Sequence, residues 1–321
     1  MIHGKLFFYQ IPFVNSIDFK GNVLNKRCGY ILQLSDTNGH FSWGEIAPLP
    51  GFSQETLAQA KSQIIKLLEQ GITSSTSKKH LYPSVQFALS CALQKIPLCS
   101  KSTSKIPVIP LLQGDILSQL AQYKALGFPS SIKIKVGRAS MEQDTRLFNS
   151  LTQLNTQVQI RCDANQAWSA SQASLFFSHI SRQHLYYIEE PTPKHTLNLT
   201  LAHTYKIALA LDETLQDASF IYQTNPQIKA LILKPTLIGS LRNIKKWVHI
   251  AQKEDLHISF SSSFESSVAL QHIRYLAEQI PLMHPISLGV DTLKYFQKAP
   301  LTQALNLKHE IQHLECVWTN D

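Results

Sequence analysis

The spacing of apolar residues changes near residue 100. Before it, short runs with a period of two occupy residues 6–11, 30–34 and 41–45, and a turn-forming stretch at 36–39 separates the last two. Alternation interrupted by Asp, Asn and Gly is typical of antiparallel strands joined by tight turns. The chain is therefore predicted to begin with an antiparallel meander.

Helical periodicity follows these runs. Apolar residues recur at intervals of three and four from Gln54 to Leu68, with Ser53 placed to cap the first turn and Gly71 beyond the last. A second apolar helix is predicted from Ser84 to Gln94. We therefore expect residues 1–100 to form an α+β capping domain, against which the C-terminal tail could pack.

Residues 101–321 show a regular alternation of short apolar runs and amphipathic stretches. The apolar runs lie at 108–112, 132–136, 158–162, 186–188, 207–211, 230–233, 257–260 and 286–288. The amphipathic stretches include 141–154, 170–180, 241–252 and 268–280. Strands that alternate with helices indicate a parallel sheet, and eight such strands predict a TIM-like barrel.

Two lysines lie within the second of these predicted strands, in the stretch Ser131–Gly137. Because side chains alternate between the faces of a strand, Lys133 and Lys135 must point to the same side. A strand that is buried on both faces is normally a continuous apolar run. The two lysines therefore need carboxylate partners or a chemical role.

Polar residues follow the ends of most predicted barrel strands. In a parallel barrel these ends meet on one rim, where the active site lies. The residues collected in this way are Lys133, Lys135, Asp163, Asn165, Glu189, Glu190, Asp212, Glu213, Lys234, Ser261, Ser262, Ser263 and Asp291. A random distribution of surface charge would not place polar groups at successive strand ends, so the pattern predicts an active site.

Three carboxylates in this set come from successive strands: Asp163, Glu189 and Asp212. Oxygen ligands without a converging histidine or cysteine favour Mg²⁺, or Mn²⁺, over zinc. Lys135 and Lys234 are expected on opposite sides of the metal. That arrangement suits proton abstraction beside a carboxylate, because a metal and an ammonium can stabilise the charge of a dianionic enediolate.

A lysine must be neutral to act as the base. Like charges disfavour the protonated form, so the metal and Lys133 are expected to lower the pKa of Lys135. Arg161 lies two residues before Asp163 and should face the same way. It could hold a substrate carboxylate or make a structural salt bridge. The segment Trp43–Ser53, which contains Phe52, could cap a ligand or pack between domains.

Composition narrows the class of protein. The net charge is +8, but no run of Lys and Arg concentrates it, so nucleic acid is not an expected partner. No apolar run approaches the roughly 20 residues of a membrane span, and the start lacks the features of a signal peptide. We expect a cytoplasmic protein whose five scattered cysteines are free thiols. The oligomeric state stays open, with a monomer favoured.

The motifs together resemble the enolase superfamily, in its muconate-lactonizing subgroup. The matching stretches are Lys133-Ile134-Lys135, Asp163-Ala164-Asn165, Ile188-Glu189-Glu190-Pro191, Asp212-Glu213 and Lys234-Pro235. The resemblance covers nearly the whole chain and implies a capped (β/α)₇β barrel. It also implies that Lys135 is the base, that Lys234 is the opposing cation, and that Asp163, Glu189 and Asp212 bind Mg²⁺.

The resemblance also suggests contacts for a small dianionic carboxylate substrate. The expected contacts are Arg161, Asn165, Ser261, Ser262, Ser263, Leu288, Gly289 and Phe52. The stretch Lys20–Arg27 matches the mobile capping loop of the family only loosely. We expect a hydro-lyase that eliminates water from this substrate. The alternatives are an N-succinylamino acid racemase or a dipeptide epimerase on the same scaffold, or a non-catalytic basic binding protein.

Overall fold

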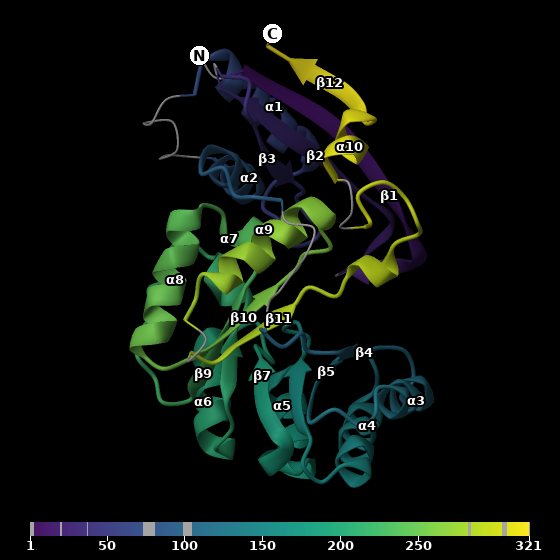
Figure 1. Ribbon diagram of the computed structural model, residues 1–321. Coiled ribbons are helices and arrows are strands. Elements are labelled where there is room, and N and C mark those ends of the chain that lie inside the picture. Colours follow the sequence, from purple (N-terminus) through teal and green to yellow (C-terminus); the bar gives the residue numbers. More distant parts are fainter. Residues whose placement is uncertain are drawn as a thin grey trace.

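The computed structural model contains two sheets that lie one above the other (Figure 1). It describes residues 3–19, 21–36, 38–72, 81–98, 105–281, 284–303 and 307–320. A four-stranded antiparallel sheet lies over an eight-stranded parallel sheet, which forms the barrel. The capped-barrel fold that was predicted from the sequence is therefore confirmed. The predicted boundary near residue 100 lies outside the described residues.

The antiparallel sheet has the order β12-β1-β2-β3. Its strands are β1 (His3–Phe19), β2 (Asn22–Ser35), β3 (Phe41–Ile46) and β12 (Glu315–Thr319). The predicted meander is confirmed, although β1 and β2 are longer than the apolar runs that predicted them. Strand β12 pairs with β1, and Leu6 lies opposite Trp318. The two ends of the chain therefore meet in one sheet (Figure 1).

The helices α1 (Leu57–Glu69) and α2 (Pro83–Leu93) cover this sheet. The predicted cap of the first helix is wrong: Thr56, and not Ser53, is the N-cap. Thr56 Oγ1 accepts from Gln59 N at 3.2 Å, and Gln59 Oε1 accepts from Thr56 N at 2.8 Å. This reciprocal capping box satisfies two backbone donors, which Ser53 alone could not do. Ser53 Oγ instead accepts from Leu49 N at 2.8 Å.

The barrel consists of parallel strands that are separated by helices. Its strands are β4 (Leu111–Leu112), β5 (Ser131–Lys135), β6 (Gln159–Asp163), β7 (Leu185–Glu189), β8 (Leu209–Leu211), β9 (Ile228–Leu233), β10 (His257–Ser261) and β11 (Ile286–Gly289). Its helices include α3 (Ile116–Ala125), α4 (Met141–Leu154), α5 (Ala170–His179), α6 (His195–Tyr205), α7 (Pro235–Ile238), α8 (Leu241–Lys253) and α9 (Ser267–Glu278), and α10 (Leu307–Gln312) leads towards β12. Among the described helices, none is long and apolar enough to cross a membrane.

Two prolines shorten the first barrel strand. The apolar run predicted a strand over 108–112, but only Leu111–Leu112 pairs regularly with β5. Pro107 and Pro110 carry no N–H and cannot donate to a ladder. Closure of the barrel depends on two bonds: Ile109 N donates to Leu288 O at 3.0 Å, and Leu288 N donates to Pro107 O at 2.9 Å.

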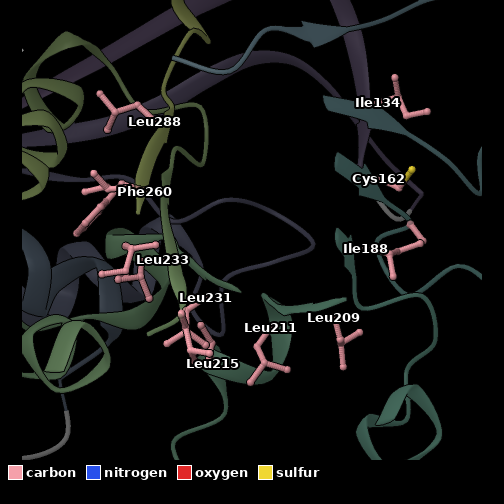
Figure 2. Close-up of a cluster of buried hydrophobic side chains, with 14 of the residues drawn as sticks. Ile134, Cys162, Ile188, Leu209, Leu211, Leu215, Leu231, Leu233, Phe260 and Leu288 are labelled. Carbon is pink, nitrogen blue, oxygen red and sulfur yellow. The ribbon is translucent and has the colours of Figure 1, made fainter. Parts of the chain in front are cut away.

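The outward faces of the barrel strands form the main apolar core (Figure 2). Figure 2 shows Leu288, Phe260 and Leu233 from neighbouring strands together in this layer. Because side chains alternate along a strand, the residues between these positions point into the barrel. The inward positions carry the polar side chains of the site. Four described cysteines are free, and Cys99 lies outside the described residues; the free thiols are Cys28, Cys91, Cys162 and Cys316.

Candidate active site

A cavity of about 530 Å³ lies at the carboxyl ends of the barrel strands, and residues from the antiparallel sheet also line it. Lys133, Lys135, Asp163 and Lys234 line its barrel side. Residues 14–17 of β1 line it from the other sheet. The site is thus built where the two sheets meet, at the rim that the strand-end pattern predicted.

Three buried carboxylates meet in this cavity. Asp163 and Glu189 end β6 and β7, and Asp212 follows β8. Ligand atoms of the three lie within 4.8 Å of one another, and within the described ranges this is the acidic group that could hold a metal ion. Asp212 Oδ1 is buried and has no hydrogen-bond partner among the residues that the structure describes. Burial and the carboxylates of Asp163 and Asp212 raise the pKa of Glu189 to about 8, although Lys133 opposes the shift.

These observations fit a divalent metal. Carboxylates this close repel one another and are costly to bury, and a cation with two charges would relieve both effects. The ligand set contains only oxygen, which suits a hard ion such as Mg²⁺. The triad therefore has the ligand set and spacing that a divalent metal needs, and it consists of the residues that the sequence nominated.

Three lysines contact the triad. Lys133 Nζ lies 2.8 Å from Asp163 Oδ2 and 2.6 Å from Glu189 Oε2. Lys135 Nζ donates to Asp163 Oδ2 at 2.6 Å, and Lys234 Nζ pairs with Asp212 Oδ2. Strands β5 and β9 are four positions apart in the order of the eight-stranded barrel. Lys135 and the lysine that follows β9 therefore approach the carboxylates from opposite sides.

The three lysines differ in how easily they lose a proton. Burial disfavours the charged form of all three. Neighbouring carboxylates outweigh burial at Lys133 and Lys234 and raise the pKa of both. Burial is the largest effect on Lys135 and lowers its pKa. The ammonium groups of Lys133 and Lys234 lower it further, although the carboxylate of Asp163 opposes the shift. Lys135 is thus the lysine of the three that is best suited to act as a base.

Asn165 and Glu190 support the triad from the loops that follow the strands. Asn165 Oδ1 accepts from Lys135 Nζ at 2.7 Å, so Asn165 orients the lysine and also lines the cavity. Glu190 points away from the metal cluster and accepts from the backbone N of Asp212 and of Thr214, both at 2.8 Å. The alternation of side chains along a strand predicted that Glu189 and Glu190 point to opposite faces. It did not predict that Glu190 accepts a hydrogen bond from the backbone N of Asp212.

Arg161 lies on the cavity wall without a carboxylate partner among the described residues. Its guanidinium donates to Ser131 Oγ and lies 4.4 Å from the ring centroid of Tyr186 and 5.5 Å from that of Tyr187. Its Nε is buried and has no hydrogen-bond partner in the described ranges. The structural salt bridge that was considered for Arg161 is therefore not formed in the described part of the chain.

Most of the expected substrate contacts line the cavity. They are Arg161, Asn165, Phe52, Ser261, Ser262, Ser263 and Gly289. Leu288 does not line it, and this expectation was wrong. Its side chain points outward into the apolar core (Figure 2), and both its N–H and its C=O bond to the segment that closes the barrel. Trp43 is also buried in a core, whereas Phe52 of the same segment faces the cavity.

Several cavity residues escaped the sequence reasoning. They are Val14, Asn15, Ser16, Ile17, Arg138, Tyr187, Phe264, Thr292, Lys294 and Tyr295, among others. Tyr187 could have been found, because it lies two residues before Glu189 and shares its face. The residues of β1 could not, because no local signal says which part of a long hairpin reaches the barrel.

A buried histidine lies deeper in the barrel interior. His257 Nε2 lies 2.8 Å from Ser287 Oγ, and Nδ1 lies 3.2 Å from the hydroxyl of Tyr186. Burial is the main reason why the pKa of His257 falls from its ordinary 6.5 to about 3, and the charge of Arg161 adds to the effect. The folded protein therefore keeps this ring neutral at pH values where the unfolded chain protonates it.

Acidification is expected to destabilise the protein through His257. Between pH 6.5 and pH 3 the unfolded state binds a proton that the folded state does not, so stability falls as the pH falls. At pH 4.5 the loss from this group is about 2.5 kcal/mol. Urea unfolding at a series of pH values should give a shallower pH dependence for His257→Gln than for the wild type. The exposed His249→Gln should match the wild type, and equal slopes in all three proteins would contradict the expectation.

Comparison with known protein families agrees with this geometry. The family described as "Enolase C-terminal domain-like" matches residues 115–303, and "MenC, N-terminal domain" matches residues 1–96. The fold and the acidic triad thus define a barrel enzyme of the enolase superfamily. A dipeptide epimerase from Cytophaga hutchinsonii has the same fold, with a TM-score of 0.76 over 94% of this chain and 89% of that one, at 19% sequence identity.

Similarity to curated proteins is more specific. The o-succinylbenzoate synthase of Pasteurella multocida is 35% identical over 90% of this chain and 88% of its own length. That of Aliivibrio fischeri is 30% identical over 99% of both chains. The crystal structure of o-succinylbenzoate synthase from Thermosynechococcus elongatus, complexed with Mg in its active site, has a TM-score of 0.76 at 25% identity and covers 97% of this chain and 99% of that one.

The chain belongs to the o-succinylbenzoate synthase family, and its activity is that of a hydro-lyase in menaquinone biosynthesis. The expected dehydration is therefore confirmed as the reaction class. The racemase and epimerase alternatives are not favoured, because the epimerase structures share the fold at low identity only.

Proposed function

We propose that Lys135 is the base and Lys234 the opposing cation in the conversion of 2-succinyl-6-hydroxy-2,4-cyclohexadiene-1-carboxylate to 2-succinylbenzoate. The observation that carries this assignment is the contrast between the two lysines. Lys135 has a lowered pKa, whereas the pKa of Lys234 is raised by Asp212 and Glu213 despite burial. One side of the site thus supplies a group that can accept a proton, and the other side keeps a fixed positive charge.

The elimination needs one proton acceptor and one proton donor on the same face of the ring. The neutral amine of Lys135 takes the proton from the carbon that bears the carboxylate. The resulting ammonium then gives a proton to the departing hydroxyl, so that the C–H and C–O bonds break, a C=C bond forms and water leaves. The hydrogen bond from Lys135 Nζ to Asn165 Oδ1 at 2.7 Å keeps the amine aimed during both transfers.

Asp163, Glu189 and Asp212 would hold Mg²⁺, and Mn²⁺ suits the same oxygen ligands. When bound, the ion supplies positive charge where negative charge develops on the substrate carboxylate. Lys133 keeps its proton and orients two of the carboxylates, Asp163 and Glu189, through its ion pairs. Lys234 faces the developing charge from the opposite side and does not exchange a proton.

The remaining contacts favour a dianionic substrate. Arg161 presents a guanidinium without a carboxylate partner to the cavity, and Phe52 covers the approach to Lys234, whose Nζ lies 5.7 Å from its ring centroid. The cavity wall across the barrel from Arg161 carries the hydroxyl groups of Ser261, Ser262 and Ser263. The antiparallel domain acts as the cap over this cavity. The free thiols of the described cysteines suit a reducing compartment, which supports a cytoplasmic location.

The proposal is tested by incubating the purified protein with the cyclohexadiene substrate and Mg²⁺ and following the loss of diene absorbance. We expect turnover that stops when a chelator is added and returns when Mg²⁺ is restored in excess. Mn²⁺ is expected to restore it as well, because both ions accept oxygen ligands. Turnover that survives thorough chelation would contradict the metal assignment. Absence of turnover by a folded, metal-loaded protein would contradict the substrate, and N-succinylamino acids would then be tested.

A further inference from the structure

Arg27 is a buried arginine that does not line the cavity. It lies on β2, and only 1% of its surface is exposed. Its Nε donates to Phe264 O at 3.1 Å, and its terminal nitrogens donate to Pro48 O at 2.7 Å, to Cys28 O at 3.2 Å and to Ala47 O. One guanidinium therefore joins three separate segments: β2, the loop after β3 and the loop after β10.

Two buried carboxylates near Arg27 are fully engaged with other groups. Glu45 accepts from Ser266 N and Ala269 N at 2.8 Å each, and so caps the first turn of α9. Glu265 accepts from Ser263 N at 2.6 Å and from the hydroxyl of Thr236. Arg27 makes no ion pair within 4.0 Å among the described residues, so its positive charge acts on Glu265 over a longer distance. Within the described part of the chain, its direct partners are backbone carbonyls.

The segments that Arg27 ties together carry two walls of the cavity. Leu49 directly follows Pro48, Phe52 lies three residues further along the same loop, and both line the cavity from the antiparallel domain. Phe264, whose carbonyl accepts from Arg27 Nε, lines it from the barrel. A guanidinium has its donors in one rigid plane, so it fixes the relative positions of the groups that it binds. An ammonium could not donate to all of these carbonyls in the same geometry.

We propose that Arg27 is a positioning residue that holds the Leu49–Phe52 wall against the Phe264 wall and thereby sets the affinity for the substrate. The inference rests on the proposed function, because it takes these walls to contact the bound diene. It concerns substrate binding and not the proton transfers, since Arg27 contacts neither the lysines nor the metal ligands of the site. Loss of Arg27 is therefore expected to raise KM while kcat changes little.

The test compares Arg27→Met and Arg27→Lys with the wild type in steady-state kinetics. For Arg27→Met we expect KM to rise by about 10-fold or more and kcat to change by less than about 3-fold, because a shifted wall weakens binding without removing the base. Mg²⁺ affinity, measured by calorimetry, should be unchanged. Methylguanidinium in the assay should lower the raised KM of Arg27→Met, and it should not affect the wild type.

Lys26→Met is the matched control. Lys26 is the neighbouring residue on β2, is exposed, and donates to Gln10 Oε1 at 2.9 Å. Its loss should leave KM at the wild-type value. A folded Arg27→Met with wild-type KM would overturn the inference, and so would a fall in kcat at constant KM. If Arg27→Met does not fold, Arg27→Lys decides: a raised KM supports the inference, and an unchanged KM overturns it.

Failure of the inference can be told apart from failure of the proposed function. If Lys135 were not the base, Lys135→Ala would retain turnover whatever the KM of the Arg27 variants. If Arg27 were only a structural residue, its variants would lose folded protein, and the folded fraction would show the wild-type KM. Circular dichroism and the active fraction, measured on the same samples, separate these outcomes.

Discussion

Lys135→Ala is expected to lower kcat by about 10³- to 10⁴-fold, within the range of about 10² to 10⁴ that general acid–base groups contribute. The expected loss lies at the upper end, because one side chain is proposed both to accept the proton and to return it to the leaving hydroxyl. Lys135 is the lysine of the site whose pKa is lowered, so neither Lys133 nor Lys234 can replace it as a neutral amine. Loss of diene absorbance in the presence of Mg²⁺ measures the effect.

Two comparisons make this result interpretable. Mg²⁺ binding by Lys135→Ala should persist, because the three carboxylates remain in place. Lys124→Ala, which removes an exposed lysine near the end of α3, should keep wild-type turnover. Near-normal turnover by Lys135→Ala would show that another group takes the proton.

Asp212→Asn is expected to abolish tight Mg²⁺ binding and, with it, turnover. Asp212 Oδ1 is buried without a partner, and Oδ2 pairs with Lys234, so the substitution removes a ligand charge and also leaves Lys234 without its closest counter-charge. Replacing a residue that only orients a metal ligand typically lowers metal affinity by about 10- to 100-fold. Removing a charged ligand should lower the Mg²⁺ affinity by more than that. Isothermal titration calorimetry with Mg²⁺ measures the affinity directly.

Asp217→Asn is the control for this substitution. Asp217 is exposed, accepts from Ser219 N at 2.8 Å and lies a short distance along the chain from Asp212. It should bind Mg²⁺ and turn over substrate as the wild type does. Wild-type Mg²⁺ affinity in a folded Asp212→Asn would remove Asp212 from the ligand set and leave Asp163 and Glu189 to be re-examined.

The sequence by itself determined the barrel and the reactive centre. Helix and strand periods are local properties, and each barrel strand carried its signal within a few residues. The lysines of β5 and the carboxylates after β6, β7 and β8 could be grouped because parallel strands bring their carboxyl ends to one rim. This rule needs no knowledge of loop conformation. It therefore predicts from the sequence that the triad, Lys135 and Lys234 lie on one rim.

Details that depend on competition between nearby groups were less predictable. Ser53 was the predicted cap of α1, but Thr56 is the cap because Gln59 can complete the reciprocal pair. Leu288 was predicted to contact the substrate because of its place at a strand end. Its backbone instead bonds to Pro107 and Ile109, which close the barrel. Such choices depend on partners that are distant in the sequence.

Only the tertiary structure decided how the antiparallel domain meets the barrel. The cavity wall formed by residues 14–17, the pairing of β12 with β1, and the contacts of Arg27 with Phe264 all join segments that are far apart in the sequence. The order and period of apolar residues predict the structure of each segment separately, but they do not predict contacts between segments that are distant in the sequence. The positions of the proposed reacting groups could thus be predicted from the sequence, because strand order places them on one rim. The shape of the space around the substrate could not, because it arises where two separately patterned domains pack together.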